Sequence, residues 1–421
     1  MPEERELTPA SQANAPLENL PAEIRRQILF SCGLDELRTL VRASPVFHQQ
    51  YLLDRKSILC SCLDATLGST TVEACALYRF EILVELLQHA PERPEAIARF
   101  RHTYDARFSP ALYSALADQL TETEAISIVA EYSSLIRPIA QQYAGWALEN
   151  LSKETQREQH QCEPLSRVEQ TRIARALYRF QLCCRMFGSR DDADVWRLGW
   201  VQPGEFNTTK FIHTMEPWEI EQFASVYTFV RAKYEQVFDD IQWDLNPDHP
   251  RFQDQQRPPT PDGAFELEGY WRDPLRTGTL SKGLRLLHTL LFKITNQEHL
   301  VTTMQANICY PKSMRLEDDV FGTTRQLYMH RERVLGWGRK TGRPLPFRGD
   351  GGPDAEGDRP PLAWTLMWRE TYSCLFGECL PDTTRHCGYV MWDAARIEGT
   401  GADEVLSGLA AELSLDIDDY T

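Results

Sequence analysis

The sequence predicts an all-α protein. Along most of the chain, apolar residues recur at the three- and four-residue spacing of helices, and few segments alternate with the two-residue period of strands. The 421 residues are 42% apolar and 25% charged, which is ordinary for a globular protein with a sizeable core. We therefore expect a small helical bundle at the N-terminus, followed by one large irregular helical domain.

The N-terminal region divides into a polar lead and a compact bundle. Residues 1–15 are polar and mixed in charge, so we expect a disordered lead without a secretory signal. Residues 16–60 predict three helices. In the first helix Leu20, Ile24 and Ile28 recur at helical spacing, and Pro21 suits a first helical turn.

The second predicted helix runs from Leu34 to Val41 and ends before Ser44–Pro45, because the residue before a proline is driven out of the α region. The third runs from Phe47 to Leu59. About forty residues rarely form a stable core alone. The bundle is therefore expected to pack on the rest of the chain or on a partner.

At these residues the chain resembles an F-box, in the divergent form found in fungal F-box-like proteins. The resemblance rests on the L-P-x-E-I start at 20–24, the Ile28–Leu29 pair and the L-x-x-L pattern at 37–40. The family's usual ending, a Val-Cys followed by a Trp, is replaced by residues 41–45. The resemblance implies docking onto the Skp-family adaptor of an SCF-type ubiquitin ligase. The residues that it places on the adaptor face are Leu20, Pro21, Ile24, Ile28, Leu29, Leu37 and Leu40.

Residues 61–413 predict the helical domain, and residues 414–421 an acidic tail. Three phrases in the domain, ALYRFQLCCRMFG, FVRAKYEQVFDD and GYVMWDAARIEG, are similar to segments of the same fungal group, which implies kinship and no chemistry. Two Pro- and Gly-rich stretches are expected to be disordered insertions in one domain. They span residues 246–263 and 338–361. Helices are expected over 72–87, 124–148, 168–187, 217–240, 280–294, 364–376, 389–396 and the first half of 402–421.

The net charge indicates which partners are disfavoured, and the cysteine content indicates the cellular compartment. The formal net charge of −16 disfavours non-specific binding to nucleic acid or to anionic membranes, so neither is expected as a partner. The sequence contains no run of eighteen apolar residues, so no membrane-spanning helix is expected. The eleven cysteines are expected to be free thiols in a reducing compartment, the cytoplasm or the nucleus.

Familiar catalytic motifs are missing from the sequence, including the phosphate-binding loop, the dinucleotide fingerprint and the H-E-x-x-H zinc motif. Two acidic clusters, at 191–194 and 239–244, resemble in spacing the carboxylates that bind Mg²⁺ and a diphosphate in all-helical enzymes. The second metal motif of such enzymes is absent. Acidic residues after helices are more often solvated, and no cofactor is expected.

A third cluster, of potential zinc ligands, has poor spacing. Cys374, Cys379, His386 and Cys387 are separated by five, seven and one residues, which does not match the paired spacing of a tetrahedral site. We expect core thiols and no metal there. Late aromatic residues could line a groove, but an aromatic-rich core is the first expectation. They are Trp337, Trp364, Trp368, Tyr389 and Trp392.

These patterns support one main hypothesis and two alternatives. The first is a non-enzymatic, substrate-recruiting subunit of a cullin ubiquitin ligase, with an unknown protein as substrate. The second is a scaffold whose F-box-like bundle is purely structural, and the third is a magnesium-dependent helical enzyme. Exposure separates the first two, because an adaptor-binding bundle leaves an apolar patch uncovered when it is alone.

Overall fold

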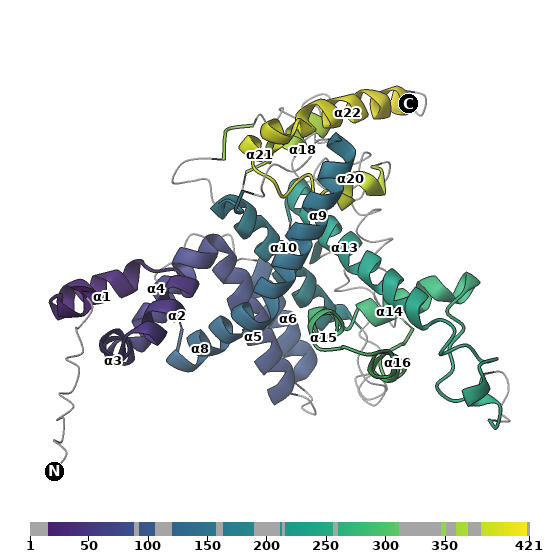
Figure 1. Ribbon diagram of the computed structural model, residues 1–421, viewed down its shortest axis with the longest axis horizontal. Helices are drawn as coiled ribbons and strands as arrows, with labels where there is room; N and C mark the ends of the chain where they lie inside the picture. Colours follow the sequence, from purple (N-terminus) through teal and green to yellow (C-terminus); the bar gives the residue numbers. More distant parts are fainter. Residues whose placement is uncertain are drawn as a thin grey trace, which may run out of the picture. The chain divides into compact units, whose positions relative to one another are not determined.

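The computed structural model confirms the all-α prediction (Figure 1). Every regular element among the described residues is a helix. The chain divides into two compact units, one formed by Met1–Thr71 with Ser109–Ala130 and the other by Val72–Phe108 with Glu131–Thr421. The structure describes residues 16–87, 92–105, 120–156, 163–188, 211–212, 215–255, 260–310, 347–350, 359–368 and 380–418.

The first unit is built around four packed helices. α1 and α2 each contact α3 and α4, and α3 contacts α4. The segment expected to be the third helix forms two helices, because the helical conformation is interrupted at Asp54. The boundary expected at residue 60 therefore falls inside α4. The elements of this unit are the 3₁₀ turn Pro16–Asn19, α1 (Ala22–Ser31), α2 (Leu34–Ala43), α3 (Pro45–Leu53), α4 (Arg55–Leu67), the 3₁₀ turn Gly68–Thr70 and α8 (Glu122–Glu131).

Local sequence explains where α3 begins. The Ser44 hydroxyl accepts a hydrogen bond from the backbone N–H of Phe47 at 3.3 Å, and Pro45 occupies the first turn. Both features are favourable at a helix start. Ser44–Pro45 thus ends one helix and begins the next. The bundle interior is apolar and is formed by Leu29, Leu34, Leu37, Phe47, Ile58, Leu59, Leu63 and Leu67.

The second unit is organised around α10 and α13, which contact each other more extensively than any other pair of helices does in the described part of the chain (Figure 1). α9 packs on α10, α14 and α20 pack on α13, and α18 packs on α22. The helices are α5 (Thr71–Leu86), α6 (Arg93–Asp105), a π-helical turn Tyr132–Ile136, α9 (Arg137–Thr155), α10 (Arg167–Phe187), α13 (Pro217–Ile241), α14 (Arg272–Leu280), α15 (Leu284–Phe292), α16 (Gln297–Gln305), α18 (Leu362–Trp368), α20 (Asp382–His386), α21 (Ala394–Thr400) and α22 (Ala402–Asp418).

The two central helices are buried on every side over much of their length. All residues in 171–184 of α10 and in 217–230 of α13 are buried. A capping box starts α10, with Ser166 and Glu169 bonding to each other's backbone N–H groups, and Pro217 stands in the first turn of α13. Because these helices carry charged residues on the faces that periodicity assigns to solvent, the core contains ions.

A chain of buried ion pairs crosses from α5 to α13 through α10. Arg179 donates to Glu73 at 2.7 Å and lies 2.9 Å from Glu219, which also pairs with Arg175 at 3.2 Å. The Tyr104 hydroxyl donates to Glu73 at 2.5 Å. Burial alone would lower the pKa of Arg179, but Glu219 and Glu73 outweigh it and raise that pKa. The guanidinium therefore stays charged inside the core.

A second buried pair joins α13 to α20. Arg385 binds Glu221 with two hydrogen bonds of 3.1 Å each, and the Tyr389 hydroxyl donates to the same carboxylate at 3.2 Å. The forked guanidinium matches the two carboxylate oxygens, which gives direction as well as energy to the contact.

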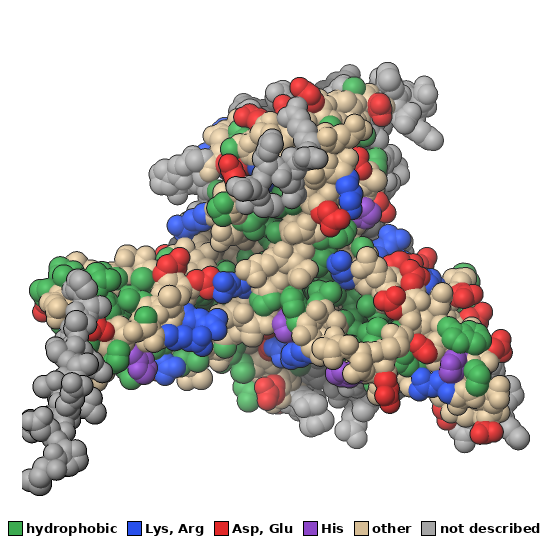
Figure 2. Space-filling model, viewed as in Figure 1, with side chains coloured by type: hydrophobic (Ala, Val, Ile, Leu, Met, Phe, Trp, Pro, Cys, Tyr) green, Lys and Arg blue, Asp and Glu red, His purple; other side chains and the backbone are tan. Residues whose placement is uncertain are grey.

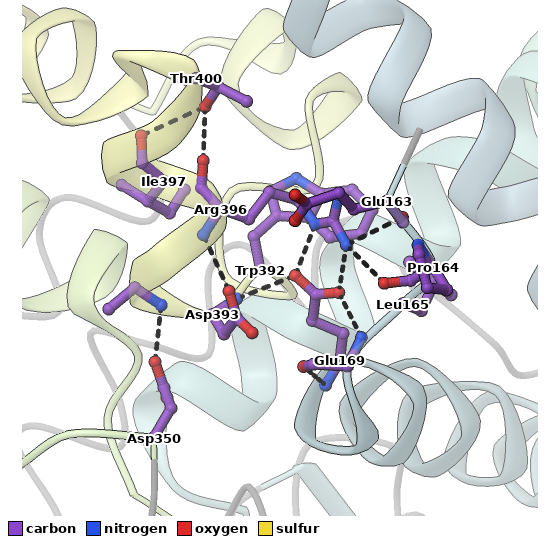
Figure 3. A network of polar contacts seen from close by, with 12 residues as sticks. Glu163, Pro164, Leu165, Glu169, Asp350, Trp392, Asp393, Arg396, Ile397 and Thr400 are labelled. Carbon is purple, nitrogen blue, oxygen red and sulfur yellow. Dashed lines mark hydrogen bonds and ion pairs between the residues drawn. The ribbon is translucent and has the colours of Figure 1, made fainter. Parts of the chain in front are cut away.

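A third polar network fixes α21 to the start of α10 (Figure 3). Glu169 accepts from Arg396 at 2.6 and 2.8 Å and from the backbone N–H of Asp393 at 3.2 Å. Nearby, Arg172 donates to Asp350 at 2.7 Å. The contacts between Glu169 and Arg396 thereby hold together segments more than two hundred residues apart in sequence.

At two glycines the structure has a turn where the sequence predicts a helix. The helix expected over 389–396 is a turn up to Trp392, and α21 starts at Ala394. Gly388, at φ +61°, allows the turn because glycine adopts this left-handed conformation readily. The helix expected over 280–294 breaks between α14 and α15, where Gly283 has φ +87°.

The stretch 246–263 contains ordered turns in its described part, because an aromatic anchor replaces the missing aliphatic residues. Phe252 is buried, and Arg251 donates to Gln305 of α16 at 3.2 Å. Residues 256–259 lie outside the described residues. Of 338–361, the structure describes 347–350 and 359–361, and Asp350 makes the ion pair with Arg172 described above.

Candidate partner-binding face

The structure separates the seven residues expected on the adaptor face into two groups. Leu29 is fully buried and Leu37 is 4% exposed. The other five have accessible surface, and Ile24 is the most informative at 41% exposed because it is a large aliphatic residue. Pro21 is exposed as well, and the half-buried members are Leu20, Ile28 and Leu40.

Leu29 and Leu37 belong to the core of the bundle. The Cys62 thiol of α4 donates to the carbonyl oxygen of Leu29 at 3.5 Å, which places this side of α1 against α4. Their expected role in touching a partner is therefore corrected to a role in holding the helices together. We define the candidate face as the remaining five residues, which are Leu20, Pro21, Ile24, Ile28 and Leu40.

Helical geometry places the α1 members together. Pro21, Ile24 and Ile28 are three and four residues apart, so they share one side of α1. Leu17, in the turn before the helix, is 50% exposed, and Figure 2 shows hydrophobic side chains gathered over the region of α1. The sequence pattern does not indicate a partner-binding role for Leu17, because a single leucine outside a periodic pattern is not distinctive.

Polar contacts fix α1 against the rest of the bundle. Arg26 pairs with Asp54 at 2.8 Å and its guanidinium lies over the Phe30 ring, 5.0 Å from the centroid. At the far end of the helix, the Ser61 hydroxyl donates to the carbonyl oxygen of Phe30 at 2.9 Å. At the near end, Arg25 donates to the backbone oxygen of Glu18 at 3.1 Å. The face is thus presented by a helix anchored at both ends.

More apolar surface lies on α3. Leu52 is 52% exposed and Leu53 is 80% exposed. Burying a leucine that is this exposed contributes about 1.5–3 kcal/mol to an association. The first unit consequently carries exposed apolar side chains on two helices.

The thiols of the bundle are unsuited to covalent or metal chemistry. Burial raises the pKa of Cys62 to about 12, with Cys32 and Glu36 adding to the effect. Burial also raises the pKa of Cys60. Because the thiolate is the nucleophile and the metal ligand, these residues act as small apolar core residues at neutral pH.

The structure describes the candidate zinc and magnesium ligands only in part. Among the described residues, no group of three His, Cys, Asp or Glu side chains is arranged to hold a metal ion. Of the candidate zinc ligands, Cys374 and Cys379 lie outside the described residues. His386 packs edge-on to Trp146 at 5.3 Å between ring centroids, and burial raises the pKa of Cys387 to about 12.

The structure describes one of the two acidic clusters. Residues 191–194 lie outside the described residues. Asp239 pairs with Arg272 at 2.5 Å, and Asp244 accepts from the side chain of Gln297 at 2.8 Å. Both carboxylates are therefore engaged by groups of the protein.

The late aromatic residues that the structure describes belong to the core. Trp364, Tyr389 and Trp392 are buried, and Trp364 packs edge-on to Trp218 at 5.5 Å. Trp337 and the side chain of Trp368 lie outside the described part. A small cavity between α9, α20 and α22 has a volume of about 20 Å³, which is room for a single water molecule.

No protein-family model matches the chain, and neither the curated proteins nor the solved structures yielded a match. Within the described residues, no helix combines the length and the apolar character needed to cross a membrane.

Proposed function

We propose that this protein is a non-catalytic, substrate-recruiting subunit of an SCF-type cullin ubiquitin ligase, which docks onto a Skp-family adaptor through its N-terminal bundle. In this proposal the ubiquitin chemistry takes place on other subunits. The adaptor contacts the candidate face, and a protein substrate is bound by the second unit.

The observation that carries the proposal is the exposure of Ile24. A bundle that only capped the protein would turn its largest aliphatic residues inward, as it does with Leu29. Ile24 instead remains 41% exposed beside the exposed Pro21. These are the proline and the isoleucine of the L-P-x-E-I pattern that resembles the F-box.

The energetic argument concerns the free and bound states. Exposed apolar side chains on an anchored helix lose little conformational freedom on docking, so most of their burial contributes to affinity. Hot spots of protein interfaces are side chains of this kind, buried at the centre of the contact. We therefore expect Ile24 to act as an anchor residue.

The test measures adaptor affinity by titration calorimetry, with a purified Skp-family adaptor and the full chain. The matched variants are Ile24→Ala and Ile82→Ala, since Ile82 of α5 is 37% exposed and lies in the other unit. We expect Ile24→Ala to weaken binding by about 2 kcal/mol, the size of a typical hot spot. We expect Ile82→Ala to leave it unchanged.

Thermal unfolding of the same variants distinguishes the proposal from the scaffold alternative. Both isoleucines are exposed, so the melting temperatures of both variants should stay close to that of the parent. A parent chain that fails to bind the adaptor would sink the ligase proposal. A large loss of stability in Ile24→Ala, together with that failure, would favour the structural bundle.

A further inference from the structure

The second unit carries an exposed group of three aromatic rings, away from the aromatic core. Tyr270 is 81% exposed, Tyr310 is 51% exposed and Trp271 is 46% exposed. Trp271 packs edge-on to Tyr270 at 5.1 Å and to Tyr310 at 6.1 Å between ring centroids. We call these three residues the aromatic cluster. Large rings that touch each other while facing water are typical of a binding surface.

The cluster stands on a fixed support. Tyr270 and Trp271 lie in a 3₁₀ turn (Gly269–Trp271) that leads directly into α14. The next residue, Arg272, donates to the carbonyl oxygen of Leu267 at 3.1 Å and to the Glu235 carboxylate of α13 at 2.9 Å. The backbone that carries Tyr270 and Trp271 is therefore held in position before any partner arrives.

On the other side, the segment that carries Tyr310 is bonded to α14. The backbone N–H of Cys309 donates to the Thr279 hydroxyl at 3.3 Å. Both halves of the aromatic cluster are thus attached to one helix. An aromatic cluster on a fixed backbone loses little conformational entropy on binding, which favours affinity.

The chain around the cluster is strongly acidic. The 39 residues from Glu235 to Asp273 contain ten acidic and three basic side chains, a net charge of −7 out of the −16 of the whole protein. Figure 2 shows acidic side chains around hydrophobic ones over the region of α14. The acids are Glu235, Asp239, Asp240, Asp244, Asp248, Asp254, Asp262, Glu266, Glu268 and Asp273, and the bases are Arg251, Arg257 and Arg272.

Three of these acids stand next to the rings in sequence. Glu266 and Glu268 precede Tyr270 and are exposed, whereas Asp273, which follows Trp271, already pairs with Arg276 at 2.6 Å. Exposed carboxylates close in sequence to exposed aromatic rings provide two elements that attract a cationic side chain, an opposite charge and a ring quadrupole.

We propose that the aromatic cluster and its flanking acids form a docking surface for an arginine- and lysine-rich segment of a partner protein. Guanidinium groups would stack on the rings of Trp271 and Tyr270 and pair with Glu266 and Glu268. Taking that partner to be the ligase substrate rests on the proposed function. The surface itself does not.

Charge decides between this occupant and the others that bind exposed aromatic rings. Nucleic acid and anionic membranes are disfavoured by the net negative charge of the segment from Glu235 to Asp273. A proline-rich segment docks on aromatic rings as well, but it gains nothing from neighbouring carboxylates. A basic segment uses both features of the surface, so it fits the structure best.

The experiment measures fluorescence anisotropy of a short fluorescein-labelled peptide of alternating arginine and serine, titrated with the full chain. Two peptides serve as comparisons, one of alternating glutamate and serine and one rich in proline without charge. The aromatic variants are Tyr270→Ala and Trp271→Ala, with Phe292→Ala as control, since Phe292 of α15 is 40% exposed. The charge variants are the double change Glu266→Gln and Glu268→Gln, with Glu404→Gln and Glu412→Gln of α22 as control.

We expect the basic peptide to bind the parent chain, and raised salt to weaken the binding. Each cluster variant should reduce affinity by about tenfold or more, the loss typical of an interface anchor. The glutamine pair at 266 and 268 should also reduce affinity. Both controls should match the parent, and circular dichroism should show that all variants remain folded.

Several results would overturn the proposal. One is the absence of binding by the parent, and another is equal binding of the proline-rich peptide. A third is an equal loss for the α22 charge pair, which would show general attraction to an acidic protein. Adaptor affinity of the same variants keeps the two proposals apart, because cluster changes should leave it unchanged and Ile24→Ala should leave peptide binding unchanged.

Discussion

At the scale of single residues, burial assigns different roles to the apolar side chains of α1. Leu29 is fully buried and contacts α4 through the Cys62 thiol, whereas Ile24 is 41% exposed. Substitutions at the two positions should therefore affect different measurements. Truncating Leu29 removes core contacts, and truncating Ile24 removes surface.

We expect Leu29→Ala to lower the free energy of unfolding by about 2–5 kcal/mol, because the lost side chain leaves a cavity that the bundle fills only in part. Urea unfolding followed by circular dichroism measures this loss. Ile24→Ala is the control and should shift the urea midpoint little. Equal losses for the two variants would contradict the division of α1 into a core side and an exposed side.

The buried pair of Glu221 and Arg385 gives a second expectation. Arg385→Met leaves the Glu221 carboxylate buried without its partner, which we expect to cost about 3–5 kcal/mol of stability. The double change Arg385→Met with Glu221→Leu should recover much of that loss, since two apolar groups of similar size need no partner. A double-mutant cycle from urea unfolding measures the coupling.

The control for this cycle is the exposed pair of Lys153 and Glu149, whose nitrogen and oxygen lie 2.8 Å apart. Lys153→Met should hardly change stability, because water screens exposed pairs. If Arg385→Met were as mild as Lys153→Met, the charges of the core would contribute nothing that depends on their burial.

At the scale of elements, glycine positions test the turn that replaced an expected helix. Gly388 has φ +61°, and an added Cβ would lie 2.8 Å from the Tyr143 hydroxyl. We therefore expect Gly388→Ala to destabilise the protein through both backbone strain and a steric clash. Thermal unfolding measures the change.

Gly145 provides the matched comparison. It lies inside α9 and is exposed, and nothing is found within 4 Å of an added Cβ. Gly145→Ala should raise stability by about 0.5–1 kcal/mol, because alanine loses less entropy in a helix. Opposite signs for the two glycines would support the turn, and a stabilising Gly388→Ala would speak for a continuous helix.

Long helices could be predicted from the sequence because their apolar residues repeat over many turns. The expectations of 168–187 and 217–240 differ from α10 and α13 by one residue at an end. Short elements near glycines could not be predicted, since one apolar run such as 389–392 fits a buried turn as well as a helix. The break at Gly283 has the same origin.

The candidate face was predictable in part. Periodicity identified the apolar positions of α1 and α2, but it does not say which of them a bundle of four helices leaves uncovered. The ionic core was not predictable, because Arg172, Arg175 and Arg179 recur at the spacing that usually marks a solvent-facing side. Only the position of α10 between its neighbours shows that this side is buried.

At the scale of the whole molecule, buried thiols give a common response to alkaline pH. Burial raises the pKa of Cys62 in the first unit and of Cys387 in the second from the usual 9.0 to about 12. Above pH 9 the unfolded chain loses these protons while the folded chain keeps them. The unfolded state then binds fewer protons, so stability falls as pH rises.

We therefore expect the urea midpoint to decrease between about pH 9 and 12, over the interval that separates the two pKa values. Cys62→Ala and Cys387→Ala should each make this decrease shallower, although both lower stability at neutral pH. Urea titrations at several pH values measure the slope. An unchanged slope in both variants would mean that other groups cause the alkaline loss.

The acidic balance of the molecule is uneven, since the segment from Glu235 to Asp273 holds a large share of the net charge. The buried charges, in contrast, occur as matched carboxylates and guanidinium groups. Some surface acids, such as Glu266 and Glu268, are exposed, whereas the core charges pair with one another inside the fold.

The pairing of charges in the core has an evolutionary consequence. Glu73, Arg175, Arg179 and Glu219 form a balanced set of two carboxylates and two guanidinium groups in the core, and a change that neutralises one of them leaves one charge in excess. Relatives of this protein should therefore carry the four residues as a set, or apolar residues at all four. Covariation among positions 73, 175, 179 and 219 across relatives would test this expectation.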